Sequence, residues 1–226
     1  QKASNILSFS PKRTMTTAQK LYEQGFITYM RTDSRTYSKE FIGKAKKFIQ
    51  SKWSGKYVND GIDALSLRKG TKKNTKKNTK DDNAQEAHEA IRPTDVTREK
   101  LSSNIDPSQQ RLYDLIWSNT VESCMVPAEY NLLSAKITAP EKYWYKYSEE
   151  LITFPGWLIV RGYEKENSIY DWMLKSEQNK IVKYSKIQSK MTLKDLKTHY
   201  TEARLVQQME KVGIGRPSTF SSLVAK

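Results

Sequence analysis

Apolar residues recur at helical spacing over the first half of the chain. After Thr14 and again after Ser38, apolar side chains return every three or four residues, so each run predicts an amphipathic helix. Either hydroxyl can cap the helix that follows it by accepting a hydrogen bond from the first turn. Asp106-Pro107 predicts the start of a third helix. We therefore expect residues 1–127 to form a helical domain with helix-turn-helix-like elements.

The pattern changes to alternation in the middle of the chain. Leu133, Ala135 and Ile137 alternate with polar residues, which is typical of strands that bury one face of a sheet. Further stretches of β type lie at 144–145, 157–160 and 180–184. Residues 128–197 are therefore predicted to form an all-β module with no chemistry of its own.

Helical spacing returns near the end of the chain. A helix that begins at Thr201-Glu202 is predicted to break at the glycine-rich turn 213–219, and a second helix is predicted to begin near Pro217 or Ser218. Residues 198–226 are therefore expected to begin another helical domain. The fold class that follows is a multidomain α+β protein.

The glycine-rich turn contains candidate phosphate ligands. It places Arg216, Ser218 and Thr219 beside a predicted helix N-terminus, where backbone N–H groups and the helix dipole favour anions. An ordinary corner between two helices accounts for the same residues equally well.

The charge balance indicates a polyanionic partner. The chain has 39 Lys and Arg residues against 25 Asp and Glu residues, a formal net charge of +14 and a pI near 9.6. Such a field favours nucleic acid; the alternative is a basic protein whose charge only aids solubility. A lysine-rich stretch at 68–80 has no acidic residue and is expected to be a disordered loop, with or without an auxiliary phosphate contact.

Other classes of protein receive less support. No apolar run is long enough to span a membrane, and no basic amphipathic helix carries an aromatic face. The single Cys124 excludes a disulfide framework and a four-cysteine zinc site within the chain. With no signal peptide visible, we expect a reducing cytoplasmic or nuclear compartment. The chain starts at Gln1 and stops inside a predicted helix, so it reads as a piece of a longer protein.

The stretch after Gly25 contains the most informative chemistry. Gly25 is predicted to end the first helix, and a short β-type run at 26–29 follows. Tyr29 and Arg31 are two residues apart, so in an extended backbone both side chains project to the same face. A phenol beside a permanent cation suits phosphoryl transfer, because the phenol can attack and the cation can stabilise oxyanions. The alternative is a strand tyrosine beside a surface charge.

A second stretch, 83–94, places His88 four residues before Arg92. On a helix the two side chains would share a face and offer a proton donor beside a fixed cation. The stretch is only superficially like the HExxH zinc-protease signature, because Arg92 stands where the second histidine is needed. Zinc is therefore unsupported, and a structural histidine is the simpler alternative.

Taken together, these motifs resemble one family. FSPKRTM at 9–15, AQKLYE at 18–23 and ITYMRTDS at 27–34 look like the nucleophile-bearing domain of type IA DNA topoisomerases, bacterial topoisomerase I in particular. AQEAHEAIRPT at 84–94 and GIGRPST at 213–219 match the family's later motifs in the same order. The chain departs from the usual pattern at Phe220, where a tyrosine is common, and at His199, where an arginine is expected.

The resemblance implies a role for each matching residue. Tyr29 would attack a DNA phosphodiester, leaving a 5′-phosphotyrosine and a free 3′-hydroxyl, so religation would need no ATP. Arg31 would stabilise the scissile phosphate, and His88 would assist in the same pocket. The other matching residues would contact DNA: Thr28, Asp33, Arg92, Arg216, Ser218 and Thr219. The implied enzyme relaxes negatively supercoiled DNA by passing single strands, as a monomer in the bacterial cytoplasm or another DNA-containing compartment.

The resemblance also implies a fold and a cofactor. The helical domain with Tyr29, a β-rich arch and the start of a helical single-strand DNA-binding domain would form part of a torus. Mg²⁺ is held in the family by an Asp-x-Asp-x-Glu cluster on an N-terminal TOPRIM domain, and no Asp-x-Asp occurs in this chain. The chain is therefore expected to supply one wall of the active site and no metal site. The alternatives are a non-catalytic nucleic-acid-binding module and an inactive relative that acts as a scaffold.

Overall fold

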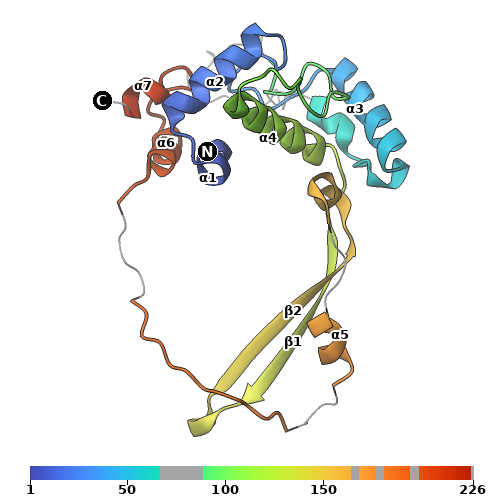
Figure 1. Cartoon of the computed structure of the whole chain (residues 1–226), viewed down its shortest axis with the longest axis vertical. Coiled ribbons are helices and arrows are strands. Elements are labelled where there is room, and N and C mark those ends of the chain that lie inside the picture. Colours follow the sequence, from blue (N-terminus) through green and yellow to red (C-terminus); the bar gives the residue numbers. More distant parts are fainter. Residues whose placement is uncertain (67–88, 164–167, 177–180, 194–198, 225–226) are drawn as a thin grey trace, which may run out of the picture. The chain divides into compact units, whose positions relative to one another are not determined.

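The computed structural model describes residues 1–66, 89–163, 168–176, 181–193 and 199–224. It combines helices with an antiparallel pair of strands, so the fold is mixed α and β. The chain divides into two compact units, residues 1–126 together with 200–226, and residues 127–199. In Figure 1 the first unit comprises the blue to green elements and the red helices. The predicted lysine-rich loop at 68–80 lies outside the described residues.

The first unit is built on the packing of α2 (Pro11–Glu23) against α4 (Pro107–Ser123), as Figure 1 shows. Leu21 of α2, Val121 of α4 and Ile49 of α3 (Lys39–Lys52) are completely buried. Burying such a side chain stabilises a fold by about 1.5–3 kcal/mol, so apolar faces hold these helices. The other elements of this unit are α1 (Lys2–Leu7), η1 (Gly55–Tyr57), η2 (Ile62–Ser66), α6 (Glu202–Lys211) and α7 (Phe220–Val224).

Side-chain caps start the long helices. The predicted caps of α3 and α4 are confirmed, because Ser38 and Asp106 accept hydrogen bonds from the first turns of their helices. The predicted start of α2 was wrong by four residues. Ser10 caps this helix and Pro11 occupies its first turn, where a missing N–H costs nothing. The Thr14 hydroxyl instead donates to the Ser10 carbonyl oxygen at 2.9 Å.

Gly25 ends α2, as predicted. The Gly25 N–H donates to the Tyr22 oxygen at 2.8 Å, and the Phe26 N–H donates to the Leu21 oxygen at 2.9 Å. This pair of bonds is a Schellman motif, which needs a left-handed residue at the position of Gly25. Its φ of 74° meets that need without strain because glycine has no Cβ. The motif turns the chain sharply away from the helix axis and directs it toward Tyr29.

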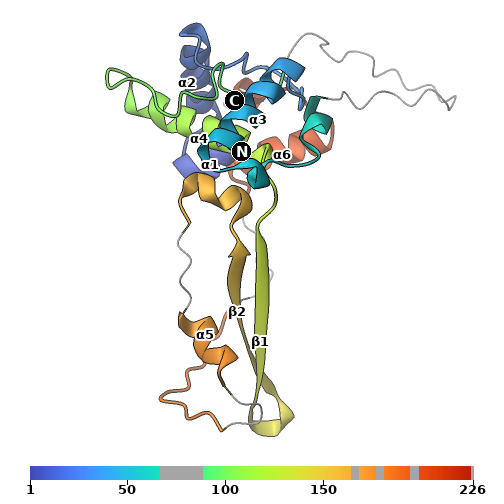
Figure 2. The same cartoon turned by 90° about the vertical axis from the view of Figure 1, so that its right-hand side faces the viewer.

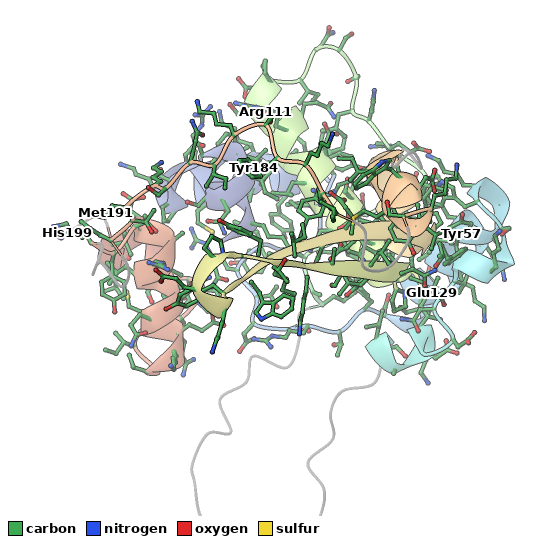
Figure 3. The ribbon with its side chains drawn as sticks, turned by 90° about the horizontal axis from the view of Figure 1, so that it is seen from below. Tyr57, Arg111, Glu129, Tyr184, Met191 and His199 are labelled. Atoms are coloured by element: carbon green, nitrogen blue, oxygen red, sulfur yellow. The ribbon has the colours of Figure 1, made fainter. Side chains whose placement is uncertain are left out.

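Cationic side chains cover an aromatic ring at the start of α2. Phe9 is 1% exposed, and the guanidinium groups of Arg13 and Arg111 lie 4.2 and 5.2 Å from its ring centroid. Arg13 also donates to the Ser108 hydroxyl at 2.7 Å. Arg111, labelled in Figure 3, projects from α4. The packing therefore fixes two positive charges beside the first turn of α2.

The second unit contains a long hairpin. Strands β1 (Glu129–Thr138) and β2 (Trp144–Phe154) pair antiparallel, with Ala135 opposite Tyr147, and the short turn η3 (Pro140–Lys142) lies between the strands (Figure 2). The predicted alternation is confirmed in β1, where half-buried and exposed residues alternate from Leu133 to Ile137.

The prediction of further strands after β2 was wrong. Residues 156–161 form the 3-10 element η4 (Gly156–Arg161), and Ser168–Leu174 form helix α5. Gly156 and Gly162 have positive φ values of 48° and 81°, so the backbone cannot run extended through this stretch. The described residues 181–184 carry no strand either. A short apolar run does not by itself distinguish strand from helix or coil.

The end of the chain returns to the first unit. Helix α6 begins at Thr201-Glu202 as predicted, and the Thr201 hydroxyl caps it by accepting a hydrogen bond from the Arg204 N–H at 3.3 Å. Helix α7 packs against α2 and α6 and begins at Phe220. Pro217 and Ser218, where the sequence predicted its start, lie in the preceding turn. Among the described helices, none has the length and apolar composition needed to cross a bilayer.

Candidate active site

Tyr29 follows a short anchored stretch rather than a strand. The β-type run predicted at 26–29 was wrong, because the described chain pairs there only through an isolated bridge between Ile27 and Pro93. Ile27 is 1% exposed, and the Thr28 N–H donates to the Arg92 oxygen at 2.9 Å. A single bridge can hold the backbone without extending into a ladder. The backbone is therefore held in place at Thr28, and Tyr29 is the first residue of an irregular loop.

Tyr29 and Arg31 line the same cavity. Its volume is about 590 Å³, and its walls come from α2, the loop that follows it and Ser221 of α7. Tyr29 is half-buried and Arg31 is exposed. Both residues thus border a space large enough for a phosphate and its neighbouring sugars. This arrangement has the components of phosphoryl transfer, a nucleophile and a cation at one surface.

The solvent-facing side of α2 forms a wall of this cavity, which sequence reasoning missed. The residues of α2 that line the cavity recur at helical spacing. They are Lys12, Met15, Thr16, Gln19, Lys20 and Glu23. Lys12 and Lys20 add positive charge to that of Arg31. Gln19 donates to the Glu23 carboxylate at 2.7 Å, which fixes both side chains along the wall. The polar residues of this stripe are evident in the sequence, but the helix was predicted from the spacing of its apolar residues.

Tyr22 is the aromatic neighbour of Tyr29. Their ring centroids are 5.2 Å apart and their planes are inclined at 68°, the edge-on arrangement that aromatic pairs favour. Tyr22 is 40% exposed, but it is absent from the cavity wall. The pair contact restricts the Tyr29 ring, and among the described tyrosines Tyr29 is the one that lines the cavity.

Thr28 and Arg92, which were predicted to contact DNA, make hydrogen bonds within the protein. The Thr28 hydroxyl donates to the Ala90 oxygen at 2.8 Å and accepts from the Arg92 N–H at 3.0 Å. The Arg92 guanidinium group pairs with Glu89 and donates to the Pro93 oxygen at 2.9 Å. Neither residue lines the cavity.

Asp33 and His88 were also predicted to act in this region. Asp33 lies exposed in the loop after Arg31 and is absent from the wall. His88 lies outside the described residues. The described part of its stretch, residues 89–94, forms no helix. Arg92 therefore does not lie on the helical face that it was expected to share with His88.

The helix that follows the glycine-rich turn lines the cavity with a residue that the sequence did not single out. Arg216 and Ser218 are exposed, and the Thr219 hydroxyl accepts from the Arg216 N–H at 2.9 Å, so it closes the turn. Ser221, two residues further on, lines the cavity. Ser221 of α7 therefore shares a surface with Tyr29, while none of residues 213–219 lines the cavity. The DNA contacts predicted for Arg216, Ser218 and Thr219 stay predictions.

Gly215 is required by the packing of this turn. Its φ is 79°, and a Cβ there would lie 2.9 Å from Leu223 Cδ1 and 3.2 Å from two atoms of the Phe220 ring. We expect Gly215→Ala to destabilise the fold by about 1–3 kcal/mol, through the left-handed backbone and the steric overlap together.

The matched control for this substitution is Gly213→Ala. Gly213 has a similar φ of 74°, but a Cβ at this position would meet no atom within 4 Å. Thermal unfolding should therefore show a smaller loss for Gly213→Ala than for Gly215→Ala. Equal losses would mean that the contact with α7 has no energetic weight.

The residues described here do not form a magnesium site. No three His, Cys, Asp or Glu side chains gather to hold a metal ion anywhere in the described part of the chain. The Glu23 carboxylate on the cavity wall is bonded to Gln19 and has no acidic companion among the lining residues.

Comparisons with known proteins agree on one family. A family model described as DNA topoisomerase matches residues 1–226. The chain is 36% identical to DNA topoisomerase 1 of Pseudomonas aeruginosa over 226 residues, which is 100% of this chain and 24% of that protein. It is 33% identical to DNA topoisomerase 1 of Escherichia coli over 236 residues, again 100% of this chain and 24% of the relative. The chain thus spans about a quarter of the length of these curated relatives.

A solved structure has a similar fold. Full-length topoisomerase I from Thermotoga maritima, in a monoclinic crystal form, matches 99% of this chain and 35% of its own, with a TM-score of 0.63 and 27% sequence identity. The family match over the whole sequence and this structural similarity lead to the same assignment. The chain belongs to the type IA DNA topoisomerase family.

Proposed function

We propose that this chain supplies the nucleophilic half of an active site that cleaves and rejoins single strands of DNA. The observation that carries the proposal is the shared cavity of Tyr29 and Arg31, with Lys12 and Lys20 on its wall. A phenol alone would be an ordinary surface group. A phenol beside three cationic side chains faces a space suited to a phosphodiester, whose charge those cations would balance.

The proposed reaction exchanges one phosphate ester for another. The Tyr29 phenolic oxygen loses its proton and attacks phosphorus, which forms a 5′-phosphotyrosine bond. The bond to the 3′-oxygen breaks, and that oxygen takes up a proton to become a hydroxyl. Arg31 would stabilise the phosphate oxygens and the developing negative charge on the phenolic oxygen. Because ester replaces ester, the reverse attack of the 3′-hydroxyl rejoins the strand without ATP.

The polar wall of α2 would bind the strand on either side of the reacting phosphate. Lys12 and Lys20 lie eight residues apart on the helix, a span of about 12 Å, or roughly two nucleotides of extended single strand. Contacts of this kind are electrostatic and weaken as salt displaces them. Arg216, Ser218 and Thr219 would extend the same binding surface. We propose single-stranded and negatively supercoiled DNA as the substrates, and a monomer in a DNA-containing compartment as the working form.

The 226-residue chain alone is expected to bind single-stranded DNA weakly and to leave supercoils unrelaxed. The family's Mg²⁺ cluster would come from a TOPRIM domain, and the residues described here offer no substitute for it. Gel assays of plasmid topology with the purified chain and Mg²⁺ test this expectation. Robust relaxation would show that this chain needs no TOPRIM domain for activity.

The proposed function is tested by covalent trapping. The full-length protein carrying this chain is incubated with Mg²⁺ and single-stranded DNA labelled at its 3′ end, because the 3′ fragment is the one that stays attached to the tyrosine, and is then denatured with detergent. Labelled DNA that remains attached to protein supports the proposal. Salt-sensitive binding with no attached DNA would instead support a non-catalytic nucleic-acid-binding module or an inactive scaffold.

A further inference from the structure

We propose that Glu89 is a positioning residue that sets the geometry of the loop carrying Tyr29 and Arg31, through its ion pair with Arg92. This inference rests on the proposed function of Tyr29. Glu89 does not line the cavity. It acts on the loop through the backbone segment 89–94, whose contacts bracket the reactive residues from both sides.

The first side is the entry to the loop. The Thr28 N–H donates to the Arg92 oxygen at 2.9 Å, and the Thr28 hydroxyl bonds to the backbone of both Ala90 and Arg92. Two residues before Thr28, the Phe26 carbonyl oxygen accepts a hydrogen bond from the Thr94 N–H at 3.0 Å. The backbone immediately before Tyr29 is thus held at successive points by residues 90–94.

The second side is the exit from the loop. The Ala90 N–H donates to the Thr36 oxygen at 2.8 Å. The Ser38 N–H donates to Oε2 of Glu89 at 3.1 Å, at the position that caps α3. The same short segment therefore binds residue 28 and residues 36–38. The intervening residues, which include Tyr29 and Arg31, form a loop whose two ends are held by one support.

The ion pair makes this support rigid. Arg92 Nε donates to Glu89 Oε2 at 2.7 Å and Arg92 Nη2 donates to Oε1 at 3.0 Å, a two-point contact that fixes orientation as well as distance. The Arg92 side chain is 12% exposed and its guanidinium carbon lies 4.3 Å from the Phe41 ring centroid. The hydrogen bonds from Arg92 hold the pKa of the Glu89 carboxyl below its ordinary value of 4.5, so the pair is charged at neutral pH.

Loss of the Glu89 carboxylate should therefore disturb the loop. Arg92 would keep a largely buried guanidinium group with its partner missing, and Ser38 would lose the acceptor that ties the loop exit to residue 89. Displacement of a reacting group by about 1 Å can slow catalysis about a hundredfold. DNA affinity should change little, because Glu89 is not among the residues that line the cavity.

The test compares Glu89→Ala and Glu89→Asp with Glu40→Ala in the full-length protein. Glu40 is the matched control because it is an acidic residue in the first turn of α3, beside the Ser38 cap that Glu89 contacts. Its side chain is 78% exposed, and among the ion pairs found it pairs only with Lys44. We expect Glu89→Ala to slow single-turnover adduct formation about ten- to a hundredfold, with the Kd for a single-stranded oligonucleotide changed by less than about twofold. Glu89→Asp should restore part of the rate, and Glu40→Ala should behave as wild type.

Hydrogen exchange provides a readout that does not depend on activity. The amides of Thr28 and Ala90 should exchange at least about tenfold faster in Glu89→Ala, while the buried helix α4 keeps its protection. Wild-type cleavage and exchange in Glu89→Ala would overturn the inference, as would a uniform loss of protection across the unit. Absence of an adduct in the wild type would sink the proposed function, and exchange at Thr28 and Ala90 would still decide whether Glu89 holds the loop.

Discussion

Tyr29→Phe is expected to abolish covalent attachment of DNA, lowering adduct yield more than about a thousandfold. The substitution removes one oxygen atom and keeps the ring that packs edge-on against Tyr22 at 5.2 Å. The cavity wall and its cations stay in place, so binding of single-stranded DNA should change by less than about threefold. The measurement is the amount of labelled DNA retained by detergent-denatured protein.

Tyr22→Phe is the control that makes this experiment specific. Tyr22 is the aromatic neighbour of Tyr29, it is 40% exposed, and it lies outside the cavity wall. The two tyrosines are neighbours and both are accessible to solvent, so position and exposure alone would not distinguish the nucleophile. Adduct yield near wild type in Tyr22→Phe and none in Tyr29→Phe would support the account, while the opposite pattern would move the chemistry to Tyr22.

Arg31→Ala is expected to slow cleavage about a hundred- to a thousandfold, because a positioned cation contributes about 3–4 kcal/mol to an oxyanionic transition state. The loss should appear mainly in the single-turnover rate, since Lys12 and Lys20 still line the cavity and hold the strand. Arg31→Lys should recover part of the rate, because it restores the charge without the planar fork of donors.

Arg35→Ala controls for loss of positive charge in the same loop. Arg35 is 88% exposed, pairs with Glu210 at 3.6 Å and does not line the cavity. We expect its cleavage rate to stay within about threefold of wild type. Equal effects of Arg31→Ala and Arg35→Ala would mean that the loop contributes only general charge, which would remove Arg31 from the chemistry.

Local signals in the sequence predicted much of the helical framework. Ser38 and Asp106 marked helix starts because capping depends on a few adjacent residues. Gly25 marked a helix end because a left-handed residue was needed there. The alternation around Ala135 likewise needs only one paired strand to appear. At the site, the two-residue spacing of Tyr29 and Arg31 was sufficient to suggest that they act together.

The remaining features depend on contacts between distant residues. The backbone before Tyr29 was predicted as a strand, but its support is the segment 89–94, some sixty residues away, which no local pattern could pair with Thr28. The contact of Arg92 with Phe41 is also long-range, whereas its ion pair with Glu89 joins residues only three apart in the sequence. Arg92, for which the family resemblance predicts a DNA contact, forms an internal ion pair in the folded chain, and its DNA contact stays a prediction.

The most direct test of the account is to identify the residue that carries DNA. The trapped adduct is digested with nuclease and trypsin, and the modified peptide is sequenced by mass spectrometry. Cleavage after Lys20 and Arg31 gives the peptide 21–31, which contains both Tyr22 and Tyr29, so fragmentation distinguishes the two. The account predicts a 5′-nucleotide on the oxygen of Tyr29. A nucleotide on Tyr22, or on a residue outside this peptide, would contradict it.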